Sequence, residues 1–214
     1  YYFNGGAYNL AKAKKAYEKS LKENPDPLWA NYQLARIYFV EGDSEKALEY
    51  INKELEFYPE NLRSLYVRGL IYGYRGKSGD LLKAEADFRR FTGWVPKEWA
   101  GYNDLAWVLS KQEKYLEAEK TLNLAFKEIL EAENNPWFWN ALGVAELNLK
   151  KYSGAAKSFK KAKELAENIT EKDWRRSYPG NNPANAKEGL SAFIAAIEEN
   201  LRRAENYKKI EGVD

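Results

Sequence analysis

The chain has 214 residues, of which 44% are hydrophobic and 31% charged, a composition typical of a folded globular protein rather than a disordered one. Its 34 Lys and Arg residues nearly balance 32 Asp and Glu residues, which argues against a nucleic-acid-binding surface and against a polybasic membrane surface. Cys and His are both absent, which excludes disulfides, zinc sites built from these residues, cysteine nucleophiles and any triad with a histidine base.

Regularly spaced prolines indicate a repeat along the chain. Pro25 and Pro59 are 34 positions apart (59 − 25), and the intervals to Pro96 and Pro136 are 37 (96 − 59) and 40 (136 − 96). Within each interval a small residue is followed four positions later by a large apolar one, which places both on one face of a helix. Alanine there allows a second helix to approach closely. The pairs are Ala13 and Tyr17, Ala47 and Ile51, Ala84 and Phe88, Ala118 and Leu122, and Ala155 and Phe159.

A second apolar pattern precedes each pair from the second repeat onward and predicts a first helix. Its residues are Leu34, Ala35 and Tyr38; Leu65, Gly69 and Tyr72; Tyr102, Leu105, Ala106 and Leu109; and Trp139, Leu142 and Gly143. Over about residues 1–166 the chain therefore resembles the tetratricopeptide repeat family. The resemblance implies an all-α fold, a right-handed α-solenoid of helix-turn-helix repeats. Asn31, Leu65, Arg68 and Glu146 depart from the family pattern.

The repeat pattern also predicts how the chain is divided. We expect a partial first repeat over residues 1–24, whose second helix covers roughly Leu10 to Glu23, followed by complete repeats over 25–58, 59–95, 96–135 and 136–166. The third repeat carries extra residues in the turn between its helices, near Lys77 to Asp80, and the fourth prolongs its second helix or the following loop from Glu128 to Asn135. Insertions belong in turns, where added length costs little.

The C-terminal part is expected to close the repeat array. After an irregular loop over 167–182, Asn182 and Pro183 predict the start of a helix that covers 183–210. An apolar stripe on this helix would cover the exposed face of the last repeat, as a terminal cap must. Within the loop, Trp174 is interpreted as a plug for the cap, the alternative being a second contact site or a lid. The stripe is Leu190, Phe193, Ile194, Ile197 and Leu201.

The family resemblance implies that the first helices line a concave groove. An aromatic groove with scattered cations suits an extended peptide or an inserted helix, although some of the aromatic residues could instead pack between repeats. Family members that grip a C-terminal carboxylate use Lys and Asn, and Tyr32 and Arg36 occupy the corresponding positions here, which argues against such a clamp. The predicted groove residues are Trp29, Tyr32, Arg36, Phe39, Arg63, Tyr66, Leu70, Tyr74, Asn103, Trp107, Lys111, Trp137, Asn140 and Val144, together with Asn148.

We therefore predict a protein-protein interaction scaffold that binds a peptide or protein segment in this groove, without a cofactor, a metal or enzymatic activity. The alternative is a regulatory or oligomerising region of a longer membrane-anchored or enzymatic protein. No apolar run reaches the roughly 20 residues that span a bilayer, and no signal peptide is evident at Tyr1. These patterns favour a cytoplasmic location over an extracytoplasmic domain tethered upstream of Tyr1, and leave the oligomeric state open.

Overall fold

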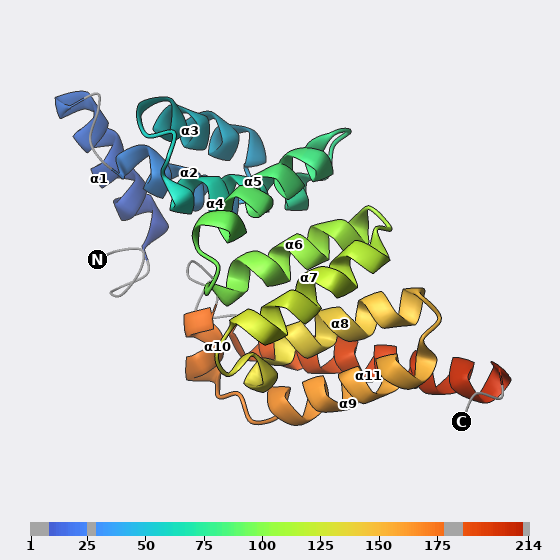
Figure 1. Cartoon of the computed structure of the whole chain (residues 1–214). Helices are drawn as coiled ribbons and strands as arrows, with labels where there is room; N and C mark the ends of the chain where they lie inside the picture. Colours follow the sequence, from blue (N-terminus) through green and yellow to red (C-terminus); the bar gives the residue numbers. More distant parts are fainter. Residues whose placement is uncertain (1–8, 25–28, 178–185, 212–214) are drawn as a thin grey trace. The chain divides into compact units, whose positions relative to one another are not determined.

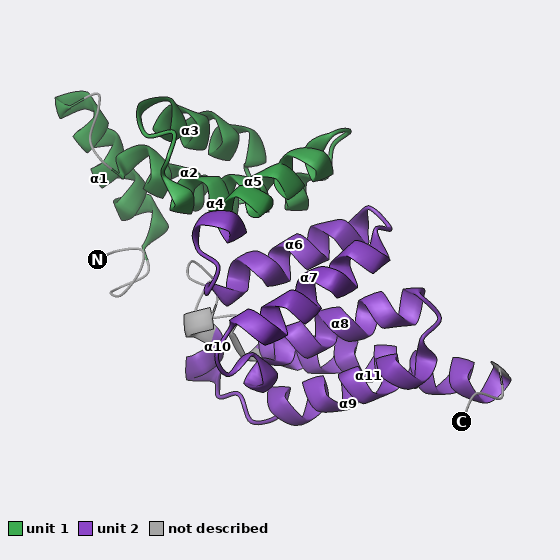
Figure 2. Ribbon diagram, viewed as in Figure 1, with its two compact units in different colours: residues 1–91, 175–186 green, residues 92–174, 187–214 purple. Residues whose placement is uncertain are grey.

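The structure, a computed structural model, describes residues 9–24, 29–177 and 186–211, and all regular elements in these ranges are helices (Figure 1). The chain divides into two compact units, one formed by residues 1–91 and 175–186 and the other by residues 92–174 and 187–214 (Figure 2). The predicted all-α repeat fold is confirmed. The predicted features at Tyr1, Pro25, Pro179 to Asn182 and Pro183 lie outside the described residues.

The first unit is built from antiparallel helix pairs. Its helices are α1 (Leu10–Glu23), α2 (Ala30–Val40), α3 (Ser44–Phe57), α4 (Leu62–Arg75) and α5 (Asp80–Trp94), whose last three residues are assigned to the second unit. The predicted start and end of α1 are confirmed. Ala47 and Ile51 of α3 are fully buried with Leu34 and Ala35 of α2, so the small and large residues form the core between the paired helices.

Local sequence sets where these helices begin. Asn9, Asp43 and Asn61 each precede a helix, and each side chain accepts a hydrogen bond from a backbone N–H in the first turn. Between α4 and α5, Gly69 faces Phe88 so closely that a Cβ on the glycine would lie 2.9 Å from the ring. The small residue of the first helix therefore makes room for the large residue of the second.

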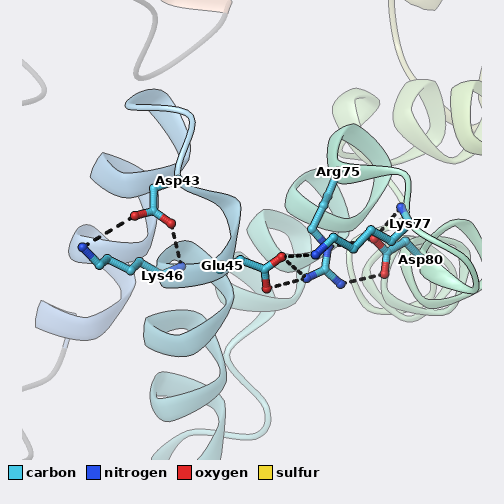
Figure 3. A network of polar contacts seen from close by, with 6 residues as sticks. All are labelled: Asp43, Glu45, Lys46, Arg75, Lys77 and Asp80. Atoms are coloured by element: carbon cyan, nitrogen blue, oxygen red, sulfur yellow. Dashed lines mark hydrogen bonds and ion pairs between the residues drawn. The ribbon is translucent and has the colours of Figure 1, made fainter.

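The inserted turn between α4 and α5 is fixed by charged side chains (Figure 3). Arg75 donates through Nε and Nη2 to the carboxylate of Asp80, both at 2.8 Å, and through Nη1 to Glu45 of α3 at 2.9 Å. The Lys77 ammonium also contacts Glu45, and the Lys77 backbone N–H donates to Asp80 at 2.9 Å. Hydrogen bonding to Arg75 lowers the pKa of Asp80, a residue that is almost fully buried. The longer turn is thereby attached to the preceding repeat.

The second unit continues the same construction. It contains α6 (Trp99–Lys111), α7 (Tyr115–Glu128), the short 3-10 helix η1 (Ala132–Asn134), α8 (Pro136–Asn148), α9 (Tyr152–Ala166), α10 (Glu171–Ser177) and α11 (Ala186–Glu211), the last two each sharing residues with the first unit. The extra residues after α7 form η1, and Trp139 of α8 donates from Nε1 to the Glu133 carbonyl there at 2.8 Å. Of the two predicted alternatives, the extra residues after Glu128 follow the second helix rather than prolong it.

The C-terminal helix α11 packs against the last helix pair. Ile197 and Ala204 of α11 are fully buried in one core cluster with Ala155 and Phe159 of α9, and α11 runs beside α9 (Figure 1). Three other residues of the predicted stripe contact this cluster while remaining partly exposed; they are Phe193, Ile194 and Leu201.

The predicted loop over 167–182 needs a correction, because residues 171–177 form helix α10. Thr170 begins this helix: its hydroxyl accepts from the Asp173 backbone N–H at 3.2 Å and donates to the Asp173 carboxylate at 2.6 Å. Trp174, only 8% exposed, attaches the short helix to the second unit. A cap and a single aromatic anchor therefore order a segment that is too short to show helical periodicity.

Candidate partner-binding surface

The N-terminus of α2 is shaped by a carboxylate from the neighbouring helix. Trp29 precedes α2 with a φ of 75° and supplies no side-chain cap. Instead Glu54 of α3, which is fully buried, accepts from the backbone N–H of Trp29 at 3.4 Å and of Tyr32 at 3.2 Å, and from Asn61 Nδ2 at 3.4 Å. A negative charge at a helix N-terminus is favourable, so Glu54 substitutes for the missing cap and fixes the backbone that carries Trp29 and Tyr32.

Four side chains of α2 and α4 form what we call the cation-aromatic row: Arg36, Tyr32, Trp29 and Arg63. The Arg36 guanidinium lies 5.5 Å from the Tyr32 ring centroid, and the Arg63 guanidinium lies 5.6 Å from that of Trp29. The two rings meet edge to face with centroids 5.4 Å apart. Both contacts place a cation against an aromatic ring, which is favourable and holds the guanidinium in position.

Burial shifts the ionisation of this row. It raises the pKa of Tyr32, against the opposing effect of the positive charges of Arg36 and Arg63. It also lowers the pKa of Arg36, with the nearby phenol groups acting in the opposite direction and Arg63 adding to the lowering. Both arginines therefore act electrostatically on the same partly buried tyrosine, and the charge of Glu54 acts on it in the opposite direction.

The other end of the α2 and α4 surface is apolar. Phe39 of α2 and Tyr74 of α4 meet edge to face with ring centroids 5.6 Å apart, and 63% of Tyr74 is exposed. Leu70 lies partly buried one turn before Tyr74. The first helices of two successive repeats are thus bridged at both ends, by Trp29 with Arg63 and by Phe39 with Tyr74, and we call this surface the α2-α4 face.

Tyr66, predicted for the same groove, takes part in packing within its own helix pair. Its ring lies 5.0 Å from that of Phe91 and 5.7 Å from that of Phe88, both in α5. This packing lies within one repeat and so differs from the alternative weighed for individual aromatic residues, which was packing between repeats.

In the second unit the predicted residues of α6 lie close together. Lys111 Nζ lies 4.7 Å from the Trp107 ring centroid, which repeats the pairing of cation and aromatic ring. Asn103 donates from Nδ2 to Asp104 at 3.1 Å. Trp107 is partly buried and Lys111 is exposed.

The predicted groove residues of α8 contact the chain's own C-terminal segment. Trp137 is stacked with Trp99 at 5.4 Å, with Phe193 of α11 at 5.7 Å and with Trp174 of α10 at 5.9 Å, between ring centroids. The interpretation of Trp174 as a plug is thereby supported. Val144 packs against the core cluster that includes α11, and Asn140 is partly buried with no donor to its Oδ1 among the described residues.

Two residues that hold these surfaces in place, Glu54 and Trp99, were not predicted from the sequence. Glu54 resembles any other glutamate of an amphipathic helix, and nothing near it in the sequence indicates burial. Trp99 could have been found, since it stands one turn before Tyr102 at the start of a predicted first helix.

Comparison with known families identifies the family to which the repeats belong. Residues 6–66 match one model described as tetratricopeptide repeat, and residues 103–168 match a second model with the same description. The chain belongs to the tetratricopeptide repeat family. Proteins of this family bind proteins or peptides, and the chain is accordingly a protein-interaction scaffold.

Curated tetratricopeptide repeat relatives match part of the chain. Photosystem I assembly protein Ycf3 of Acaryochloris marina is 35% identical over 75 residues, which are 34% of this chain and 45% of that protein. TPR repeat-containing protein MJ1428 of Methanocaldococcus jannaschii is 32% identical over 139 residues, 59% of this chain and 24% of that protein. The matched region thus spans less than half the length of these relatives.

Solved structures share the tetratricopeptide repeat fold at low sequence identity. The crystal structure of MamA has a TM-score of 0.64 at 20% identity and covers 74% of this chain and 89% of that one. PilW, a type IV pilus biogenesis factor, has a TM-score of 0.66 at 18% identity and covers 95% and 84%. These likenesses show the fold alone.

Two further properties of the described residues concern membranes and metal ions. None of the helices in residues 9–24, 29–177 and 186–211 combines the length and apolarity needed to cross a bilayer. In the same part of the chain, no three acidic side chains gather as a metal site would require.

Proposed function

We propose that this scaffold binds a peptide or protein segment on the α2-α4 face. The observation that supports the proposal is the pair of Phe39 and Tyr74, whose rings meet across two first helices while most of Tyr74 remains exposed. An exposed aromatic residue held by a neighbour offers a large contact area with little loss of side-chain entropy on binding.

The second unit carries a separate candidate surface on α6, formed by Trp107, Lys111 and Asn103. Trp137 and Val144 are left out of the proposal because they contact the C-terminal segment of the chain itself. Tyr66 supports the α2-α4 face from within the helix pair. A role in assembling a larger complex is consistent with the similarity to Ycf3, a photosystem I assembly protein, and to PilW, a type IV pilus biogenesis factor.

Affinity purification with quantitative mass spectrometry tests the proposal. The bait is the wild-type chain, the double variant Phe39→Ala/Tyr74→Ala, or the control Lys120→Ala on the exposed side of α7. We expect the double variant to recover each specific partner about tenfold less well or worse, with the control unchanged and circular dichroism equal for all three.

Two other results would contradict binding on the α2-α4 face. If Lys120→Ala loses the partners and the double variant keeps them, binding occurs on the second helices. If no variant changes recovery and light scattering shows a concentration-dependent oligomer, the oligomerising role is supported instead.

A further inference from the structure

The second unit contains an aromatic slot that is filled by one of the chain's own side chains. The Trp174 ring of α10 lies 5.9 Å from that of Trp137 in α8 and 5.5 Å from that of Phe193 in α11, between centroids. Gly189 of α11 also faces this ring, because a Cβ on the glycine would lie 2.9 Å from the indole Nε1. We call the place lined by Trp137, Phe193 and Gly189 the Trp174 slot.

The residues that line the slot are held by contacts that do not involve α10. Trp137 is stacked on Trp99 of α6, with ring centroids 5.4 Å apart. Phe193 is stacked on Trp137 at 5.7 Å and packs against the core cluster of α9 and α11, in which Ile197 of the same helix is fully buried. The slot should therefore keep its shape when Trp174 leaves it.

Helix α10 buries much less than the helices that line the slot. The three residues of α10 before Trp174 are exposed, and Trp174 itself is buried. A helix of seven residues is unstable in isolation, and contacts between charged groups at exposed positions contribute little to holding it. Segments with little buried apolar surface open with a smaller free energy than the core beside them. We therefore expect α10 to open more readily than α11, which is anchored by Ile197 and Ala204.

From this arrangement we infer that the Trp174 slot is a binding site for a large aromatic side chain on a short segment of a partner protein. Trp174 occupies the site in the free chain, and the partner's ring replaces it when α10 opens. Two aromatic rings and a glycine suit an indole or phenyl ring, which gains stacking contacts with both rings. The inference goes beyond the proposed function, because it concerns a different surface, on α8 and α11.

A peptide copy of α10 tests the slot. The probe is a synthetic peptide of residues 168–177 with a fluorine-labelled tryptophan at position 174, and its binding to the chain is followed by fluorine NMR. In the wild type the tethered Trp174 competes at an effective concentration of about 1 mM, so a peptide with a Kd of about 0.1 mM for the open slot is weakened about tenfold. We therefore expect the Trp174→Ala chain to bind the probe about tenfold more tightly than the wild type does.

Matched changes assign the binding to the aromatic ring and to the slot. An unlabelled peptide with Trp174→Phe should displace the probe, and one with Trp174→Ala should not. Adding Gly189→Leu to the Trp174→Ala chain places a side chain in the slot and should weaken binding about tenfold. Adding Gly93→Leu should not, because Gly93 is exposed and no atom lies within 4 Å of its added Cβ. Adding Phe39→Ala/Tyr74→Ala should also leave binding unchanged, which separates the slot from the α2-α4 face.

Thr170→Ala gives a second test that leaves every residue of the slot in place, in case Trp174→Ala folds poorly by circular dichroism. It removes the hydroxyl that caps α10, so the probe should bind about fivefold more tightly than it does to the wild type.

Three outcomes would overturn the inference. Equal binding by the wild-type, Thr170→Ala and Trp174→Ala chains, or no binding to any of them, would leave Trp174 as a part of the cap alone. Displacement of the probe by the Trp174→Ala peptide would show that the ring is not what is recognised. A wild-type dimer in light scattering that Trp174→Ala abolishes would mean that the slot holds α10 of a second copy instead of a partner's segment.

Discussion

Arg68 and Asp87 form a two-point ion pair between α4 and α5: Nε and Nη2 of the arginine each donate to one carboxylate oxygen at 2.8 Å. Arg68 Nη1 also donates to Asn52 of α3 at 3.2 Å, and the hydrogen bonding to Asp87 raises the pKa of Arg68. The family pattern favours leucine at this position, so an ion pair takes the place of an apolar contact. Asp87 is nearly fully buried, and Arg68 is the cation that pairs with it.

We therefore predict that Arg68→Leu alone lowers the free energy of unfolding by about 2–3 kcal/mol, because it leaves the Asp87 carboxylate buried without its cation. The double variant Arg68→Leu/Asp87→Leu should be within about 1 kcal/mol of the wild type, since an apolar pair can replace a buried ion pair. Urea unfolding followed by circular dichroism measures both. Equal losses in the single and double variants would mean that packing, not charge pairing, holds the residues together.

Gly143 is predicted to be required for the packing of α8 on α9. A Cβ on Gly143 would lie 2.7 Å from the ring of Phe159, which is fully buried. Gly143→Ala should therefore destabilise the chain by about 1–3 kcal/mol, although alanine favours helix more than glycine does. Gly93→Ala is the matched control: no atom lies within 4 Å of its added Cβ, so it should be neutral or slightly stabilising. A thermal melt that ranks the two variants the other way would contradict the packing.

The C-terminal helix is predicted to protect the last repeat. Ile197→Asp places a charge in the core shared by α9 and α11 and should cost several kcal/mol, about the range of the largest single-residue effects. The milder Ile194→Asp and truncation before Pro183 should act in the same direction and promote self-association. Light scattering and urea unfolding measure the two effects. Ala196→Asp, on the exposed side of α11, should change neither.

Stability should depend on pH through Glu146. Burial raises the pKa of Glu146, the hydrogen bond from Ser158 at 2.6 Å opposes this, the charge of Glu119 adds to it, and Lys151 opposes it. The folded chain thus holds this proton more tightly than the unfolded chain. The contribution is fully present below the ordinary glutamate value of 4.5 and is lost as the pH rises through the raised pKa.

Urea unfolding at several pH values from about 4 to 7 tests this dependence. Glu146→Gln should flatten the curve of unfolding free energy against pH, while Glu164→Gln, at an exposed position of α9, should leave its slope unchanged. Parallel curves for wild type and Glu146→Gln would show that this carboxyl group has no raised pKa in the folded state.

Much of the fold can be predicted because each helix carries its own signal. The four-residue spacing of Ala155 and Phe159, or of Ala47 and Ile51, defines a buried face without knowledge of the rest of the chain. Helix α10 was not predicted because its seven residues are too few to show the apolar periodicity of a helix. Thr170 and Asp173 do have the spacing of a helix cap.

The candidate site was only partly predictable for a different reason. Pattern alone assigns both Trp137, near the start of α8, and Tyr74, near the end of α4, to the groove side of first helices. Whether such a ring stays exposed depends on whether distant parts of the chain pack against it. Trp174 and Phe193, which contact Trp137, lie 37 and 56 residues further along the chain (174 − 137 and 193 − 137). Contacts between residues so far apart in the sequence cannot be predicted from the spacing of apolar residues within one helix.

Glu54 has a consequence for how the α2-α4 face moves. The backbone amides of Trp29 and Tyr32 are tied to a side chain buried in α3, so the first turn of α2 is unable to fray while α3 remains packed. In a hydrogen-exchange experiment these two amides should open with the free energy of the whole helix pair rather than that of a helix end. A segment that binds there meets an already ordered surface, and its affinity is not reduced by the entropy of ordering α2.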